Sequence, residues 1–364
     1  MNRRDVLAML SMALTGAHTP AFAQSLPVQS VAGVVPPDHP LQASWEIWKS
    51  LYLRPDGRVV DGYQDNASHS EGQGYGLTLA AAFGDLPVFE TIFRWTEEHL
   101  AIRADALLAW RWLPDQTPSV PDTNNASDGD LFYAWALAAM AARHDRPEFA
   151  DRAVQITRDL ARLCVVSDPS TEGRFLFLPA AEGFVRDGSY IINPSYYMPR
   201  AMRELAVMTG VDLLAKVAAD ADVLFADIAD AGLVPDWIGV GASGWTPPPE
   251  LFSAKTGYEA IRVPLFAVWS GQPSSPWVAR YISAVSAPSG DGTGIVFDRE
   301  TGQILESSSD PGYQAVAALS VCAKNGDIGA AMPAFSGTQP YYPATLHLMT
   351  LIIQSEKYPQ CVPL

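Results

Sequence analysis

The sequence is poor in the residues that build disulfide scaffolds and metal centres. Its 364 residues include three cysteines and six histidines, and neither type forms the closely spaced pairs that a zinc site needs. One disulfide at most can form, and Cys322 and Cys361 are the pair we expect. Cys164, in an apolar helical segment, would then be a buried thiol. The sequence predicts neither a metal site nor a cofactor.

Basic clusters are also missing, as is any long apolar run after the first residues. The chain has 24 Lys and Arg against 40 Asp and Glu, a formal net charge of −16. Such a charge repels nucleic acid and anionic lipid, and a membrane span needs about 18 apolar residues or more. We therefore exclude nucleic acid and a membrane span, and expect a neutral or cationic substrate.

The first 23 residues resemble a bacterial export signal. The pair Arg3-Arg4 precedes the apolar stretch 6–15, and Ala21-Phe22-Ala23 has the form of a cleavage site. Paired arginines favour the twin-arginine route. We expect residues 1–23 to be removed, leaving a periplasmic or secreted protein with a net charge of −17.

Helical periodicity dominates the rest of the chain. Strand-like alternation is limited to short pieces such as 175–178, and no flexible linker follows Pro36. Residues 24–364 are therefore expected to form a single domain. The expected helices span 42–53, 73–84, 87–99, 129–143, 147–164, 195–208, 211–230, 257–270, 275–285, 311–322 and 342–356.

Several of these helices come in pairs with short connections. The segments 73–84 and 87–99 form one pair and 129–143 and 147–164 another, and proline opens the second helix of each. About six such hairpins would close into a double ring, with loops of the inner helices gathered at one end. A solenoid would show a fixed repeat period, and none is found. The sequence predicts an all-α toroid.

One glutamate stands in an unusual setting. Glu71 lies among glycines, hydroxyls and a tyrosine in the stretch 68–76, just ahead of an apolar helical run. Flanking glycines mark tight turns or the close approach of a ligand. The setting suits an acid catalyst, and it equally suits a favourable charge in the first turn of a helix.

Three further stretches combine polar and aromatic residues. Asp128 and Asp130 end the long polar run 120–130, where they serve as helix caps or face a substrate. In 256–264, Glu259 and Arg262 are spaced as an ion pair on one helical face. The third stretch, 192–199, joins an amide to two tyrosines that are either core or binding residues.

Four motifs together resemble glycoside hydrolase family 8, and the likeness runs from about Trp45 to about Ser355. Within that family, the chain is similar to members that accompany bacterial cellulose synthase. The resemblance implies an (α/α)6 barrel with a few short strands, inverting hydrolysis of β-1,4-glucan, and a cellulose synthase complex as a partner. The motifs are Ser70-Glu71-Gly72-Gln73-Gly74-Tyr75-Gly76, Asn125-Ala126-Ser127-Asp128-Gly129-Asp130, Asn193-Pro194-Ser195-Tyr196-Tyr197 and Tyr258-Glu259-Ala260-Ile261-Arg262-Val263-Pro264.

The resemblance also implies catalytic roles. Inversion uses two carboxyl groups, one that protonates the leaving oxygen and one that activates water. Glu71 matches the general acid of the family. Asp128 matches an aspartate that holds the distorted sugar, and Glu259 stands at the position of the general base. Arg262 matches an arginine that keeps the base ionised.

Glu259 departs from the family pattern, which has aspartate at this position. The extra methylene moves the carboxylate by up to about 1.5 Å, and a misplacement of ~1 Å can cost ~100-fold in rate. Three outcomes stay open. Glu259 acts as the base after local adjustment, Asp130 or Asp65 takes the role, or the protein binds glucan and cleaves it poorly.

Aromatic rings suit the apolar faces of sugars. We expect Trp110, Trp112, Tyr196 and Tyr197 to line a sugar groove, with Asn193, Tyr258 and Arg262 as polar partners of the substrate. The leading prediction is an exported endo-β-1,4-glucanase. The alternatives are a glucan-binding accessory of cellulose secretion with weak turnover, and a chitosanase, xylanase or mixed-linkage glucanase of the same family.

Overall fold

The computed structural model describes residues 30–363 except 187, 289 and 291. The expected export signal, residues 1–23, lies outside the described residues. In this part of the chain no helix is long and apolar enough to cross a membrane.

The described residues form eleven helices, one for each segment expected from the periodicity. They are α1 (Leu41–Tyr52), α2 (Ser70–Ala82), α3 (Leu86–His99), α4 (Ser127–His144), α5 (Pro147–Leu163), α6 (Pro199–Thr209), α7 (Leu213–Asp230), α8 (Arg262–Trp269), α9 (Pro276–Val285), α10 (Pro311–Asn325) and α11 (Tyr341–Lys357).

Two helices, α6 and α8, start four or more residues later than predicted, and proline or a turn explains each. α6 begins at Pro199, since proline disfavours helical geometry in the residue before it, and Met198 is extended. Ahead of it stands a short 3₁₀ turn, η1 (Pro194–Tyr196). α8 begins at Arg262, because residues 256–261 form a bridge and turns. Glu259 is therefore presented by a loop and not by a helix.

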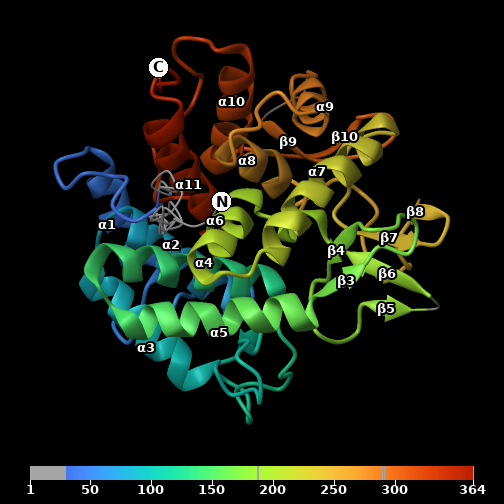
Figure 1. Ribbon diagram of the computed structural model, residues 1–364. Helices are drawn as coiled ribbons and strands as arrows, with labels where there is room; N and C mark the ends of the chain where they lie inside the picture. The colour runs from blue at the N-terminus through green and yellow to red at the C-terminus, as the bar shows by residue number, and fades with distance from the viewer. Residues whose placement is uncertain (1–29, 187, 289, 291, 364) are drawn as a thin grey trace, which may run out of the picture.

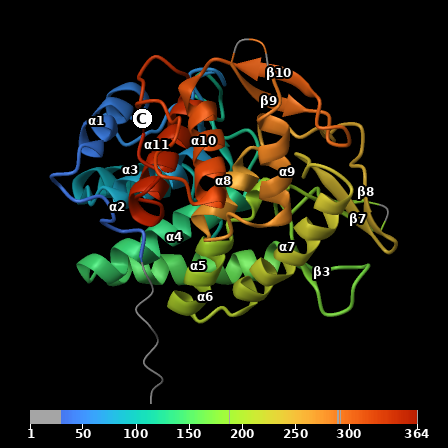
Figure 2. The same cartoon turned by 90° about the horizontal axis from the view of Figure 1, so that it is seen from above.

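The helices pack into one body (Figures 1 and 2), and their contacts define an inner ring and an outer layer. α2, α4, α6, α8 and α11 contact one another in that order, and α11 contacts α2 to close the ring. α1, α3, α5, α7, α9 and α10 pack outside them. Five helical hairpins and α1 make up the barrel. α1 packs outside the ring against α11 and the end of α2, with Trp45 stacked on Phe83 and Trp48 bonded to Thr345. This arrangement confirms the predicted (α/α)6 class.

The two layers differ in sequence for a physical reason. The outer helix α5 buries one stripe, which includes Phe149, Ala153, Ile156 and Leu160, as expected of an amphipathic helix with one packed face. The inner helix α4 is buried from Ser127 to Ala141 and is rich in alanine. An inner helix has neighbours on every side, so apolar and small residues surround it.

Glycine allows α2 and α4 to meet closely at their N-terminal ends. A Cβ added to Gly129 would lie 2.5 Å from the backbone nitrogen of Glu71, and one added to Gly74 would lie 2.8 Å from the carbonyl oxygen of Gly129. No side chain larger than hydrogen fits at either contact. The two glycines therefore bring Glu71 and Asp128 side by side.

In the described part of the chain, ten short strands form four small antiparallel sheets on the barrel. More strands are present than the alternation of the sequence indicated, although the expected piece at 175–178 is strand β4. The strands are β1 (Ser68–His69), β2 (Arg111–Trp112), β3 (Val165–Ser167), β4 (Phe175–Phe177), β5 (Val185–Arg186), β6 (Ser189–Ile192), β7 (Ile238–Gly241), β8 (Gly244–Thr246), β9 (Thr293–Phe297) and β10 (Ile304–Ser308).

Two of these sheets position parts of the site described below. β1 pairs with β2, with His69 opposite Arg111, and carries the chain directly into α2. β5–β8 form one four-stranded sheet at an edge of the molecule in both views.

The expected disulfide is confirmed, because Cys322 and Cys361 are bonded to each other. The bond ties the segment after α11 to α10. Cys164, at the end of α5, is a buried free thiol as predicted.

Candidate active site

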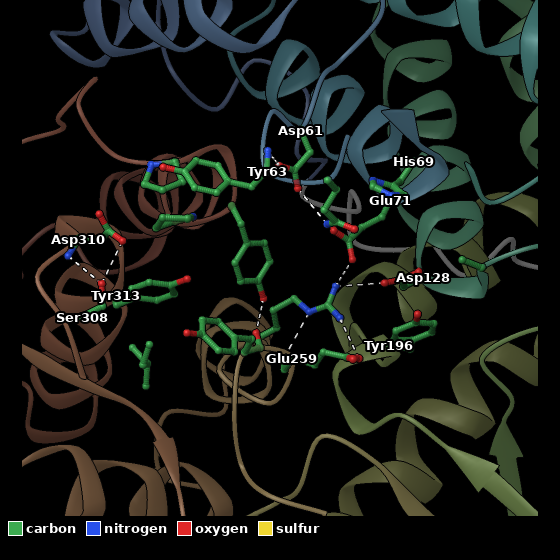
Figure 3. Close-up of a pocket in the computed structure, with 18 of the residues that line it drawn as sticks. Asp61, Tyr63, His69, Glu71, Asp128, Tyr196, Glu259, Ser308, Asp310 and Tyr313 are labelled. Atoms are coloured by element: carbon green, nitrogen blue, oxygen red, sulfur yellow. Dashed lines mark hydrogen bonds and ion pairs between the residues drawn. The ribbon is translucent and has the colours of Figure 1, made fainter. Parts of the chain in front are cut away.

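A cavity of about 680 Å³ opens at the end of the ring where the inner helices begin (Figure 3). Glu71 comes from the first turn of α2, Asp128 from the first turn of α4, Arg262 from the start of α8 and Tyr342 from the start of α11. The positive ends of four helix dipoles thus face the cavity. That field favours carboxylates at this position.

Arg262 is the centre of the polar network. Its Nη1 donates to Glu71 Oε2, to Asp128 Oδ2 at 3.1 Å and to the hydroxyl of Tyr75 at 2.9 Å. Its Nη2 donates to Ser195 Oγ at 2.7 Å and lies 3.8 Å from Glu259 Oε2. One buried guanidinium therefore faces all three candidate catalytic carboxyl groups.

Asp128 is almost completely buried beside Glu71. Burial, reinforced by the negative charge of Glu71, raises the pKa of Asp128 well above its usual range, although Arg262 opposes the change. The two carboxyl groups thus lie side by side, and both are bonded to Nη1 of Arg262.

Glu259 is held by both of its oxygens. Trp237 Nε1 donates to Oε1 at 3.1 Å, and Asn193 Nδ2 donates to Oε2. Asn193 is itself fixed, because its Oδ1 accepts from the backbone and the hydroxyl of Ser195. Burial raises the pKa of Glu259, while Arg262 and the two donors oppose the rise. The side chain is still 37% exposed, so it is reachable from the cavity.

A buried aspartate supports the loop that carries Glu259. Asp236 accepts from the backbone of Gly257 and of Ala260, each at 2.9 Å, and from Ser253 Oγ at 2.9 Å. These bonds fix the loop on both sides of Glu259. Trp237 follows Asp236 directly, so one short segment holds both the loop and the carboxylate.

The two alternative bases that the sequence left open lie elsewhere. Asp130 is fully buried and accepts from the backbone of Leu108 and from Asn125. Asp65 is exposed in a turn with a φ of 55°. Neither lines the cavity, whereas Glu259 does.

The expected binding residues divide into two groups. Trp110, Tyr196 and Tyr258 line the cavity, and Tyr258 is 48% exposed. Trp112 packs edge-on against Trp95, and Tyr197 is a core residue whose hydroxyl accepts from the backbone of Phe177. Asn193 is buried and holds Glu259.

Several cavity residues were not expected from the sequence. They come from loops, from the end of β1 and from the first turns of α10 and α11, and they meet only in the folded chain. They include Asp61, Tyr63, Gln64, His69, Asp310, Tyr313 and Tyr342. Within the residues that the structure describes, no group of three or more His, Cys, Asp or Glu is arranged to hold a metal ion.

Several carboxyl groups around an aromatic-walled cavity suit a glycoside hydrolase, which uses a pair of Asp or Glu residues on either side of the bond that it cleaves. The family model for glycosyl hydrolases family 8 matches residues 21–356. The chain therefore belongs to glycosyl hydrolase family 8, whose members are inverting glycoside hydrolases.

Individual relatives agree with this assignment. The chain is 32% identical to a probable endoglucanase of Novacetimonas hansenii, over 97% of this chain and 99% of the relative. The solved endo-β-1,4-glucanase of Acetobacter xylinum is 30% identical and superposes with a TM-score of 0.76, covering 90% of this chain and 99% of its own. The endoglucanase of Komagataeibacter sucrofermentans, also 30% identical, has a TM-score of 0.77 and covers 86% and 97%.

Proposed function

We propose that this protein is an exported endo-β-1,4-glucanase that hydrolyses cellulose-type chains with inversion. The observation that carries the proposal is the convergence of Glu71, Asp128 and Glu259 on the guanidinium of Arg262, inside a cavity that Trp110 and Tyr196 help to line. The relatives named above are described as endoglucanases.

In the proposed reaction Glu71 is the general acid and Glu259 the general base. Glu71 gives its proton to the glycosidic oxygen as the bond to the anomeric carbon breaks. Water attacks that carbon from the opposite face and passes a proton to Glu259. Asp128, bonded to the same guanidinium nitrogen as Glu71, holds the sugar at the cleavage point.

The geometry supports Glu259 as the base in spite of its extra methylene. Asn193 and Trp237 each hold one of its oxygens, so the longer side chain has a defined position. The other carboxyl groups on the cavity wall, Asp61 and Asp310, are bonded to neighbours on their own loops. Compared with Asp61 and Asp310, Glu259 is the carboxyl group that lies close to Arg262.

We further propose that residues 24–364 act as a single catalytic domain, in the periplasm or outside the cell. One hydrophobic cluster extends from Val31 to Cys361, which supports a single unit. A link to a cellulose synthase complex rests on the likeness of the motifs to members of the family that accompany that enzyme.

The test is reducing-sugar release by the protein without residues 1–23, on carboxymethylcellulose, xylan and chitosan in parallel. The proposal predicts cleavage of carboxymethylcellulose with inversion, and loss of cleavage in Glu71→Gln and in Glu259→Gln. Preferred cleavage of xylan or chitosan would assign a different substrate within the same family.

The glutamate at position 259 favours one second candidate, a glucan-binding accessory with weak turnover. The variant Glu259→Asp separates the two. If Glu259 is a competent base, the aspartate variant is slower than the wild type, because its carboxylate no longer meets both donors. If the wild type is nearly inert and the aspartate variant gains activity, the binding role is the better description.

A further inference from the structure

His69 occupies a distinctive place on the wall of the cavity. It is the last residue of β1 and stands two positions before the general acid, Glu71. It lines the same cavity as Glu71, and Figure 3 shows it beside Glu71 and Asp61. Nothing in the proposed reaction uses it.

The imidazole of His69 has a buried nitrogen without a partner. Among the described residues, none is hydrogen-bonded to its Nε2. A buried polar atom left unpaired costs about 1–3 kcal/mol, so such atoms are usually satisfied. Ser70 Oγ and the hydroxyl of Tyr341 are also unpaired nearby, but neither residue lines the cavity. Of these three residues, His69 is the one that forms part of the cavity wall.

The ring of His69 is joined to a sugar-binding candidate. It stacks on Trp110, with ring centroids 5.8 Å apart and an interplanar angle of 21°. The guanidinium of Arg111 lies 4.3 Å from the centre of the Trp110 ring. Trp110 is thus held by its neighbours and, like His69, lines the cavity.

The charge of His69 suits a neutral ligand. Burial lowers the pKa of His69, assisted by Arg111 and opposed by the carboxylates of Glu71 and Asp61. The ring is therefore neutral at neutral pH, with one nitrogen that donates and one that accepts. A hydroxyl group, which also donates and accepts, matches such a ring better than an anion does.

We propose that His69 is a specificity-determining residue that hydrogen-bonds a hydroxyl group of the sugar unit lying against Trp110, next to the general acid. The inference rests on the proposed function, because it assumes that the cavity binds a β-1,4-linked glycan. The hydrogen bond from His69 adds a polar contact to the aromatic contact of Trp110, so that the same sugar unit is bound through its apolar face and through a hydroxyl group.

The experiment measures binding of cello-oligosaccharide by calorimetry in the Glu71→Gln background, where no cleavage interferes. His69→Phe keeps a flat ring against Trp110 and removes both nitrogens, whereas His69→Gln returns an amide nitrogen close to the place of Nε2. His144→Phe is the matched control, because His144 Nε2 is also buried and unpaired but His144 does not line the cavity.

The proposal predicts that His69→Phe raises Kd by about tenfold, the usual worth of one hydrogen bond to a sugar hydroxyl. His69→Gln should recover most of the loss, and His144→Phe should leave Kd unchanged. Unchanged binding in His69→Phe, or a loss in His69→Gln alone, overturns the proposal, since stacking would then explain the residue.

The same series separates this inference from the proposed function. If the Glu71→Gln protein binds xylo- or chito-oligosaccharide in place of cello-oligosaccharide, the proposed substrate is wrong, and the His69 variants are compared on the ligand that binds. If it binds none of the three, the proposed function and the role of His69 both fail.

Discussion

Gly129 controls the distance between the two carboxyl groups at the acid end of the site. In Gly129→Ala the new Cβ would lie 2.5 Å from the backbone nitrogen of Glu71 and 2.6 Å from the carbonyl carbon of Ser70. Non-bonded atoms prefer about 3.5 Å, so the start of α2 must move by about 1 Å. These atoms belong to the backbone and cannot rotate away.

Two costs follow from this displacement. Moving a catalytic group by about 1 Å can lower the rate about 100-fold, and overpacking a core costs roughly 1–3 kcal/mol. We expect kcat on carboxymethylcellulose to fall about 100-fold in Gly129→Ala, together with a lower Tm in circular dichroism. The rate is to be measured at a temperature at which the variant is fully folded.

The control is Gly290→Ala, since a Cβ added at Gly290 meets no atom of the described residues within 4 Å. This variant should keep the wild-type kcat and Tm. Wild-type kcat in Gly129→Ala would refute the reasoning, because it would mean that the spacing of α2 and α4 does not position Glu71.

Three further changes test the supporting residues. Arg262→Lys keeps the positive charge but loses the planar guanidinium group, which binds several partners at once. Both kcat and Tm should fall. A variant that retained both values would contradict the central role of the guanidinium. Trp237→Phe removes one hydrogen-bond donor to Glu259, so the pKa of Glu259 should rise. The acidic limb of the pH–rate profile should then move to higher pH, and kcat should fall about tenfold or more. An unmoved limb argues against Glu259 as the base. Burial raises the pKa of Asp130 to about 7, so the folded state binds this proton more tightly than the unfolded state, where the pKa is about 3.9. The free energy of unfolding therefore falls by roughly 4 kcal/mol as pH rises from about 4 to 7. In urea unfolding measured at pH 5 and pH 8, Asp130→Asn should show a smaller decline than the wild type. An equal decline in both proteins would mean that Asp130 does not cause it.

The sequence predicts the helices well, because inner and outer helices both carry a clear apolar pattern. It places the start of α8 too early, since the residues around Glu259 have helical composition but are bound by Asp236, which lies more than twenty positions away. A pattern based on nearest neighbours does not contain such a contact.

The candidate site is only partly visible in the sequence. Composition does not distinguish Tyr196 from Tyr197, yet one lines the cavity and the other packs in the core. No motif marks Trp237, and although His69 lies in the stretch 68–76, its place on the cavity wall follows from the folded chain alone. The catalytic roles expected for Glu71, Asp128 and Glu259 rest on motifs that resemble a known family.

The closure of the inner ring has a consequence for how the chain acquires its site. α11 comes last among the described helices, yet it packs between α2 and α8, and Trp48 of α1 is bonded to Thr345 across 297 positions of sequence. Contacts between such distant segments form slowly, because a long loop has to close first. While the chain grows on the ribosome, the proposed catalytic residues are all made before the helix that completes the wall of their cavity. Hydrolytic competence should thus appear after synthesis and abruptly, when α11 docks, and a chain that stops before Tyr341 should have no assembled site.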